Sequence, residues 1–366
     1  MTLFHEPMSA TMILRKSALL ATATLLMSCS GTPEGSLQER AAAIHDQAVV
    51  IDAHAHPKPG AAETVVLGAK TGTFELDFIT MKEGGLDAVF FNLPMLSSET
   101  REQPVSDLIL EDARTVMDEV ERYPNLAEVA VSPEDVARIH QLGKRAVLFG
   151  VETADPFGGY VGTLARLYDA GIRMITLPSE AISTPDPEQE DSSGLPLNDF
   201  GLRIVEEMNR LGMIIDITHT SDRLQMDIIR ASSKPVVASH SCTRALNDIP
   251  REMPDSVIRE LADRGGVVSV TFFPGHISSD FPDSTVTVED LVDHIDHIVE
   301  IVGADHVGFG SDFLGSEVHT VGLESAAALP AITHTLLQRG YSEEDIEKFL
   351  GGNLLRVFRA VQESDG

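Results

Sequence analysis

The chain has only two cysteines, Cys29 and Cys242, and no tryptophan among its 366 residues. A framework of structural disulfides is therefore excluded, and Cys242 is expected to be a small buried hydrophobe. Basic residues are also scarce, because 27 Lys and Arg stand against 57 Asp and Glu and give a net charge of −30. A surface of this sign repels phosphates, which argues against nucleic acid as a partner.

The amino terminus carries an apolar run over residues 18–27 that follows Arg15 and Lys16 and is too short to span a bilayer. The run leads into Leu-Met-Ser-Cys at residues 26–29, which resembles a bacterial lipoprotein signal with cleavage before the cysteine. We therefore predict a signal peptide over residues 1–28, a lipid anchor on Cys29, and a place in the cell envelope, on the periplasmic face or at the outer membrane. An ordinary secretory peptide is the alternative.

Beyond this segment, residues 29–36 are expected to form a short tether, residues 37–361 one catalytic domain and residues 362–366 a tail. Short apolar runs rich in β-branched residues recur in the domain, each followed by a segment of helical period. The eight runs cover residues 49–54, 86–94, 146–152, 174–178, 214–219, 235–240, 266–273 and 307–312. Intervening segments such as 108–123, 200–211 and 289–302 are predicted to be helices.

This alternation predicts an α/β fold with a parallel sheet, and the count of eight favours a (β/α)8 TIM barrel of the metal-dependent hydrolase type. A doubly wound open sheet is the alternative, but it predicts a Gly-rich loop after the first strand, where this chain has His-Ala-His-Pro-Lys-Pro. The polar, aperiodic segment 180–199 is expected to be a loop over the barrel mouth, either a lid or disordered.

Polar side chains stand at the carboxyl ends of the predicted strands, where such a barrel carries its chemistry. The first strand ends in His54 and His56, whose spacing of two places both imidazoles on one face. Later strands end in Glu152, His219, His240 and Asp312. A single histidine here is more often a core residue and a single aspartate an N-cap, but the joint occurrence favours a metal site. Imidazoles with carboxylates favour zinc, with iron, manganese and cobalt left open.

The predicted set of metal ligands indicates hydrolysis by metal-activated water. One carboxylate between two pairs of imidazoles allows two ions about 3.5–4 Å apart to share a hydroxide that attacks a substrate carbonyl. Asp312 is not needed as a strong ligand, so we assign it the acid/base role, in which it takes the proton from the attacking water and passes it to the leaving amine.

In their order along the chain, these residues and their flanking motifs resemble the membrane dipeptidase family, also called renal dipeptidase-like or peptidase family M19, within the amidohydrolase-type barrels. The similarity covers the barrel nearly end to end, in residues 51–54, 150–152, 209–219, 239–241, 251–255, 307–313 and 351–358. The resemblance implies a set of metal ligands: His54 and His56 on one zinc, Glu152 bridging, and His219 and His240 on the second zinc.

The resemblance also implies that Asp312 handles the proton and that Arg251 holds the terminal carboxylate of the substrate, for which a guanidinium fork is suited. For Arg251, a surface arginine at a helix start is the alternative. His276, after the seventh strand, is expected to be either a substrate contact or a plain loop residue.

Three departures from the family pattern bear on the substrate. His56 stands where the family usually has Asp, so we expect retained metal binding with an altered metal preference. Ser179 stands where the family carries a histidine that polarises the scissile carbonyl, and losing such a donor costs about 100-fold or more in rate. Residues 153–155 read Thr-Ala-Asp instead of Gly-Gly-His. The fourth strand ends without a lysine, which argues against the phosphotriesterase-like and urease-like relatives.

The leading hypothesis is therefore a zinc-dependent dipeptidase of the cell envelope that tolerates a D-residue at the carboxyl end of its substrate. The second hypothesis is an amidohydrolase that acts on N-acyl amino acids or lactams. The third is a catalytically silent zinc-binding lipoprotein. A homodimer is left open. His294 and His297 lie among Asp290, Asp293 and Asp296 and suggest a second metal cluster, but a solvated charged helix face is predicted instead.

Overall fold

The computed structural model describes residues 34–57, 64–69, 75–93, 103–152, 155–183, 194–316 and 318–363. The predicted signal peptide and the predicted lipidation site Cys29 lie outside these residues. Helix α1 begins at Glu34, within the last three residues of the segment that is expected to be a tether. None of the helices in the described ranges has the length and apolar character needed to cross a bilayer.

Eight parallel strands form the barrel in the order β1-β2-β4-β5-β6-β7-β8-β9, which confirms the predicted fold. Their bounds are Ile51–Ala55 (β1), Ala88–Leu93 (β2), Arg145–Val151 (β4), Ile172–Thr176 (β5), Ile214–Asp216 (β6), Val237–Ala238 (β7), Val267–Val270 (β8) and Val307–Phe309 (β9). Each strand falls within or beside one of the eight predicted runs. A further strand that the sequence pattern did not indicate, β3 (Ala127–Val129), pairs with the first residues of β4.

The barrel closes where β1 meets the residues that follow β9. The backbone N–H of His56 donates to the carbonyl of Phe313 at 2.9 Å, and that of Asp312 donates to the carbonyl of His54 at 2.8 Å. A Cβ at Gly310 would overlap with the carbonyl oxygen of Ser239, so this close approach of backbones requires glycine. Closure therefore places the predicted metal ligands of β1 directly beside Asp312.

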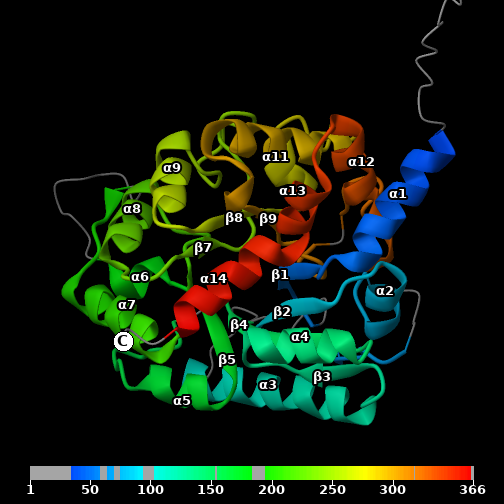
Figure 1. Ribbon diagram of the computed structural model, residues 1–366. Coiled ribbons are helices and arrows are strands. Elements are labelled where there is room, and N and C mark those ends of the chain that lie inside the picture. The colour runs from blue at the N-terminus through cyan, green and yellow to red at the C-terminus, as the bar shows by residue number, and fades with distance from the viewer. Residues whose placement is uncertain are drawn as a thin grey trace, which may run out of the picture.

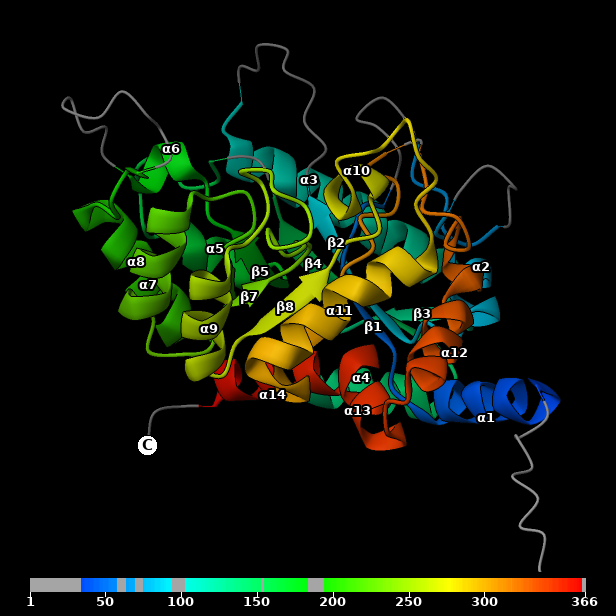
Figure 2. The same ribbon diagram turned by 90° about the horizontal axis from the view of Figure 1, so that it is seen from above.

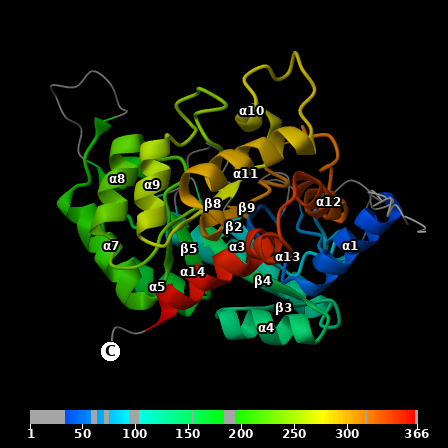
Figure 3. The ribbon, with the colours of Figure 1, turned by 45° about the horizontal axis from the view of Figure 1, so that its top comes forward.

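Helices surround the strands (Figures 2 and 3). Their bounds are Glu34–Gln47 (α1), Phe78–Glu83 (α2), Val105–Arg122 (α3), Pro133–Gln141 (α4), Thr163–Asp169 (α5), Ser179–Ile182 (α6), Asp199–Leu211 (α7), Asp222–Ala231 (α8), Asp255–Asp263 (α9), Pro274–Ile277 (α10), Val288–Val302 (α11), Pro330–Arg339 (α12), Glu343–Glu347 (α13) and Asn353–Gln362 (α14).

Helix α7 illustrates how the sequence sets these elements. The side chain of Asn198 caps its first turn by accepting from the backbone of Gly201 at 2.7 Å. The buried side chains of Ile204, Val205 and Met208 lie on one face. Gly212 ends the helix in the left-handed conformation, with φ of 78°.

Two apolar layers separate the inside of the barrel from its outside. On β2, Ala88 and Phe90 pack with the barrel interior, whereas Val89 and Phe91 pack with the layer beneath the surrounding helices. Helix α14 lies across the ring in Figure 1, and its Phe358 joins the interior layer. This helix covers the amino-terminal ends of the strands, so the carboxyl ends form the open end.

The segment 180–199 differs from the predicted loop. Residues 180–182 belong to helix α6, Ser183 forms a β-bridge with Leu197, and α7 begins at Asp199. The amide of Asn198 donates to the carbonyl of Ser183 at 2.9 Å and ties the two ends together. Residues 184–193 lie outside the described ranges.

Candidate metal centre

Glu152, directly after β4, lies between two pairs of histidines. Its Oε2 is 3.3 Å from Nε2 of His54 and 3.6 Å from Nε2 of His56. Its Oε1 is 2.8 Å from Nε2 of His219 and 3.3 Å from Nε2 of His240. We call His54, His56 and Oε2 the inner half-site and His219, His240 and Oε1 the outer half-site. The structure thus brings all five predicted ligands together, with one carboxylate oxygen facing each pair.

The spacing of the donor atoms fits a metal ion in the inner half and is shorter than an ion requires in the outer half. Donors on one tetrahedral ion with bonds of about 2.0–2.2 Å lie about 3.3–3.6 Å apart. The inner distances fall in this range. In the outer half, Nε2 of His219 lies 3.0 Å from Nε2 of His240 and 2.8 Å from Oε1 of Glu152, so these donors would have to separate slightly around an ion. Nε2 of His54 is buried and has no hydrogen-bond partner, which leaves it free for an ion. In the described ranges, groups that could hold a metal occur only here.

Asp312 lies at the edge of the inner half-site. Its Oδ1 is 3.4 Å from Nε2 of His56 and 4.0 Å from Nε2 of His54, and its side chain is 18% exposed. The backbone of Asp312 is left-handed, with φ of 59°, as is that of His219, with φ of 66°. Such conformations cost about 1–3 kcal/mol each and cluster at functional sites. The turn is held by Glu75, whose Oε2 accepts from the backbone of Leu314 at 2.8 Å.

Charge is distributed unevenly between the two halves. Burial opposes a charge on His54, but Glu152 and Asp312 outweigh it and raise the pKa of His54 to about 9. Burial and the adjacent His54 lower the pKa of His240 to about 3. Burial also opposes ionisation of Glu152, yet the charge of His54 and hydrogen bonds from His219 and His240 hold its pKa well below the usual range. Glu152 is therefore ionised at neutral pH, and both its oxygens can accept.

Asp312 is ionised as well. Burial opposes its charge, but a hydrogen bond from His56 and the positive charges of nearby imidazoles hold the pKa of Asp312 below its usual range. At neutral pH the carboxylate of Asp312 therefore begins as a proton acceptor.

The sequence analysis missed several residues behind the ligands. Oδ1 of Asp52 accepts from the backbone of His54 at 3.0 Å and from that of Ser311 at 2.8 Å. Oδ1 of Asp216 accepts in the same way from Thr218 at 3.0 Å and from Ser239 at 2.9 Å. Both aspartates are buried and precede a candidate metal ligand, His54 or His219, by two or three residues. An Asp-x-His or Asp-x-x-His spacing at a strand end is the signal that could have found them.

A hollow of about 590 Å³ borders the outer half-site. His219, Ser179 and Arg251 all line it. The guanidinium of Arg251 donates to the carbonyl of His240 at 2.7 Å and to Oγ of Ser241 at 3.2 Å, while its Nε is buried without a partner. No described carboxylate forms an ion pair with Arg251, although its charge helps to lower the pKa of the buried Glu252, so the guanidinium in the hollow has no direct carboxylate partner.

His276 does not line this hollow among the described residues. Its Nδ1 lies 2.9 Å from Oε1 of the buried Glu252, and the loop around it is held by Asn247, whose amide donates to the carbonyl of His276 at 2.8 Å. The backbone N–H of Cys242 donates to the other oxygen of Glu252, and Cys242 is buried as expected. The structure therefore gives His276 a position beside the loop that carries Arg251.

The predicted charged face of α11 is partly wrong, because His294 is buried. Its Nδ1 accepts from the backbone of Thr243 at 3.2 Å, and its Nε2 lies 2.9 Å from the carbonyl of Ile277. Asp293 and Asp296 instead pair with Arg339 at 2.7 and 2.6 Å. Helical spacing puts His294 on the same side as Leu291 and Ile298, which the charges of its neighbours in sequence conceal.

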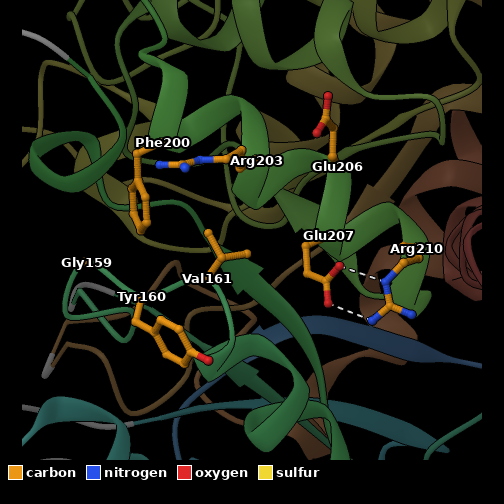
Figure 4. A pocket seen from close by; sticks show the side chains of 8 residues that line it. All are labelled: Gly159, Tyr160, Val161, Phe200, Arg203, Glu206, Glu207 and Arg210. Atoms are coloured by element: carbon orange, nitrogen blue, oxygen red, sulfur yellow. Dashed lines mark hydrogen bonds and ion pairs between the residues drawn. The ribbon is translucent and has the colours of Figure 1, made fainter.

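A second hollow, of about 580 Å³, lies between the loop before α5 and helix α7 (Figure 4). Tyr160, Phe200 and Arg203 line it, and Glu207 pairs there with Arg210 at 2.6 Å. None of the candidate metal ligands borders this hollow, and the charges of Glu207 and Arg210 compensate each other. We therefore place the chemistry at the metal centre.

Known proteins resemble this chain over most of its length. Residues 38–365 match the membrane dipeptidase family (peptidase family M19). Dipeptidase tcpJ of Claviceps purpurea (strain 20.1) is 36% identical over 246 residues, which are 67% of this chain and 57% of that protein. Dipeptidase verJ of Clonostachys rogersoniana is 32% identical over 299 residues, which are 78% of this chain and 76% of that protein. This chain thus spans little more than half the length of the first.

A solved structure shares the fold. The probable dipeptidase PvdM from Pseudomonas aeruginosa is 25% identical, with a TM-score of 0.77 over 90% of this chain and 99% of that one. The family match extends across the barrel and includes every residue of both half-sites. This chain belongs to the membrane dipeptidase family, peptidase family M19.

Proposed function

We propose that the protein is a dipeptidase that holds two zinc ions, one in each half-site, with Glu152 bridging them. The observation that carries this proposal is the division of four histidines between the two oxygens of one carboxylate. A bound zinc pair supplies a water molecule that is nucleophilic near neutral pH and polarises the carbonyl that is attacked. The histidine-rich donor set supports zinc over magnesium or calcium.

Asp312 is the proposed acid/base. Its carboxylate is ionised and lies beside the inner half-site, so Oδ1 can take a proton from the attacking water. The same oxygen then gives this proton to the nitrogen of the departing amino acid, which avoids expulsion of an amide anion. Partial exposure of Asp312 lets it reach a substrate at the mouth of the barrel.

Arg251 is the proposed receptor for the substrate's carboxylate. Its guanidinium bonds to the main chain of His240, itself an outer ligand, so a carboxylate held there lies close to the metal centre. We infer that only one residue separates this carboxylate from the cleaved bond, so that a dipeptide is preferred to a longer peptide. Ser179 and Ser183 are small side chains in the same hollow, so we extend the proposal to a C-terminal residue of either L or D configuration.

The test is hydrolysis of a panel of L-L and L-D dipeptides, with their C-terminal amides as paired substrates. Asp312→Asn should reduce kcat by about 10²–10⁴-fold. Arg251→Ala should reduce kcat/KM about 10–100-fold for the free acids but little for the amides, because the amides lack the charge that Arg251 binds. Arg244→Ala is the matched control, since Arg244 lines the same hollow but is bound at 2.6 Å to Asp222.

A second candidate function is the hydrolysis of N-acyl amino acids or lactams. It is favoured by Ser179, which puts a hydroxyl in the hollow where the family carries a histidine. If N-acyl amino acids or lactams are cleaved faster than every dipeptide, and Arg251→Ala does not distinguish acids from amides, this function replaces the first. Bound metal without any cleavage would leave a binding role.

We also propose that Cys29 anchors the protein to the membrane of the cell envelope through lipid. Cys29→Ala should release the processed protein into the soluble fraction, and mass spectrometry of the amino terminus should find a lipidated cysteine in the unaltered protein. A soluble, unlipidated form would contradict the anchor. Sedimentation of the protein lacking residues 1–29 tests for a homodimer.

A further inference from the structure

The hydroxyl of Ser239, on the loop after β7, touches both half-sites at once. Its Oγ lies 3.1 Å from Nδ1 of His54 and 2.9 Å from Nδ1 of His240. The rings of His54 and His240 are themselves in contact, with centroids 3.7 Å apart. Ser239 is completely buried, so no solvent competes for these contacts. One atom is therefore shared by an inner and an outer ligand.

The orientation of this hydroxyl follows from its third partner, Asp216. Oδ2 of Asp216 lies 2.7 Å from Oγ of Ser239, and its Oδ1 accepts from the hydroxyl of Thr218 at 2.7 Å. An ionised carboxylate can only accept, so the single proton of the Ser239 hydroxyl points to Asp216. The proton of Thr218 is likewise committed to Asp216 and leaves Ser239 with two free lone pairs.

Those two lone pairs match the two imidazoles. Nδ1 of His240 must then donate its N–H to Oγ of Ser239, because the hydroxyl has no second proton to give. Nδ1 of His54 also lies 3.0 Å from the side-chain amide nitrogen of Asn92, whose Oδ1 is buried without a partner. With this amide in its flipped orientation, the N–H of His54 is shared by Oγ of Ser239 and the amide oxygen of Asn92. An imidazole protonated at Nδ1 carries its lone pair on Nε2, and both Nε2 atoms face Glu152. The other two ligands differ, because Nδ1 of His56 is buried without a hydrogen-bond partner and His219 is half-exposed.

We propose that Ser239 is a positioning residue that couples the two half-sites: its hydroxyl, oriented by Asp216, fixes His54 and His240 in one tautomer and presents both Nε2 lone pairs to the ions. The inference rests on the two-ion centre of the proposed function. Loss of this one hydroxyl should therefore weaken the binding of both ions together, although Ser239 is not a ligand of either ion.

Two neighbours provide matched controls. Thr218→Val removes a buried hydrogen bond of 2.7 Å to the same Asp216, together with two long contacts, 3.4 Å to Oγ of Ser239 and 3.5 Å to the backbone nitrogen of His240. It leaves both contacts between Ser239 and the imidazoles in place. The amide of Asn92 lies 3.0 Å from Nδ1 of His54 and has no contact with His240, so Asn92→Ala perturbs only the inner half. Comparison of the three variants separates a general loss of packing from a loss at one half-site and from coupling.

The experiment is chelator competition with Co²⁺, followed by its visible absorption, on metal-depleted protein lacking residues 1–29. We expect Ser239→Ala to weaken both binding constants about 10–100-fold. Thr218→Val should lower Tm but leave both constants unchanged, and Asn92→Ala should weaken one. The coupling would be overturned if Ser239→Ala weakened metal binding at one half-site only. It would also be overturned if Thr218→Val weakened both binding constants as much as Ser239→Ala does.

A second readout is the ¹⁵N spectrum of the zinc-loaded protein, in which two histidines should show a protected Nδ1–H that Ser239→Ala makes exchangeable. If Ser239→Ala does not fold, Asp216→Asn keeps the side-chain shape but can donate to Ser239, so both constants should again fall. Unchanged constants in Asp216→Asn would contradict the proposal. Two bound ions without dipeptide cleavage would refute the proposed function alone, whereas fewer than two ions in the unaltered protein would refute both.

Discussion

The inner and outer half-sites share one carboxylate but differ in their surroundings. His54 is fully buried and His56 nearly so, within a barrel closed by hydrogen bonds between β1 and the residues after β9. In the outer half His240 is buried, whereas the side chain of His219 is 41% exposed and lines the hollow that contains Arg251. The inner half is thus part of the fold, and the outer half faces the hollow in which we propose that the substrate binds. Changes in the two halves should have separable effects.

Removing the charge that both halves share should have the largest effect. In Glu152→Gln an NH₂ group replaces one oxygen, and an amide nitrogen that carries protons offers no lone pair to a metal. We expect the loss of at least one ion per chain. Activity should fall by about 10²–10⁴-fold or more, which is the range expected when an acid/base residue is removed. Elemental analysis and hydrolysis on one sample would measure both.

Glu119→Gln is the control for Glu152→Gln, because Glu119 is a buried carboxylate on α3 that pairs with Arg122. It should leave metal content and activity unchanged. A Glu152→Gln protein that retains both ions would remove the bridging role and, with it, the division into two halves.

The stability of the metal-free protein should distinguish the halves next. His54→Ala leaves a cavity and removes the positive charge beside the buried Glu152, so we expect a loss of about 2–4 kcal/mol in the free energy of unfolding. His219→Ala removes a half-exposed ring, for which about 1 kcal/mol or less is expected. Urea unfolding in the presence of a chelator, followed by circular dichroism, measures both. Equal losses would show that the inner half is no more a part of the fold than the outer.

The sequence predicted the inner and outer ligands for the same reason that it predicted the barrel. Parallel strands bring their carboxyl ends together, so residues as distant in sequence as His54 and Asp312 meet once eight buried strands are counted. Family resemblance gave the same ligand set. Strand β3 was not predicted from the sequence because it is only three residues long and pairs with β4 outside the barrel order.

The hydrogen bonds behind the ligands could not be predicted in this way. Ser239 meets His54 across 185 residues of sequence, and no periodic pattern indicates which serine does so. The buried state of His294 was hidden for a similar reason, since its neighbours in sequence are charged while its partners Thr243 and Ile277 come from distant parts of the chain. Strand-end spacing therefore locates the ligands, but contacts between loops decide their tautomers and burial.

A smaller effect is expected from pH, and its sign differs from one half to the other. With its pKa raised to about 9, His54 is protonated at pH 7, so an inner ion must displace this proton. The affinity of the inner half should rise by up to about tenfold per pH unit as the pH approaches about 9 and then level off. His240, with its pKa lowered to about 3, is already neutral and adds no such dependence to the outer half. Chelator competition at several pH values should show that only one of the two metal-binding constants changes with pH. If both constants changed equally with pH, the assignment of the pH dependence to His54 would be wrong.

The smallest effect should come from restoring the carboxylate that the family usually has in place of His56. Nε2 of His56 lies 3.6 Å from Oε2 of Glu152 and 3.4 Å from Oδ1 of Asp312, so His56→Asp puts a third negative charge beside these two. A carboxylate is a harder ligand than an imidazole and favours manganese relative to zinc. We expect both ions to be retained, with a shift in the zinc-to-manganese affinity ratio of about tenfold or less confined to the inner half. Competitive loading with both metals measures that ratio. A shift in the outer half as well would mean that charge passes between the halves through Glu152, and the two could then no longer be treated as separate sites.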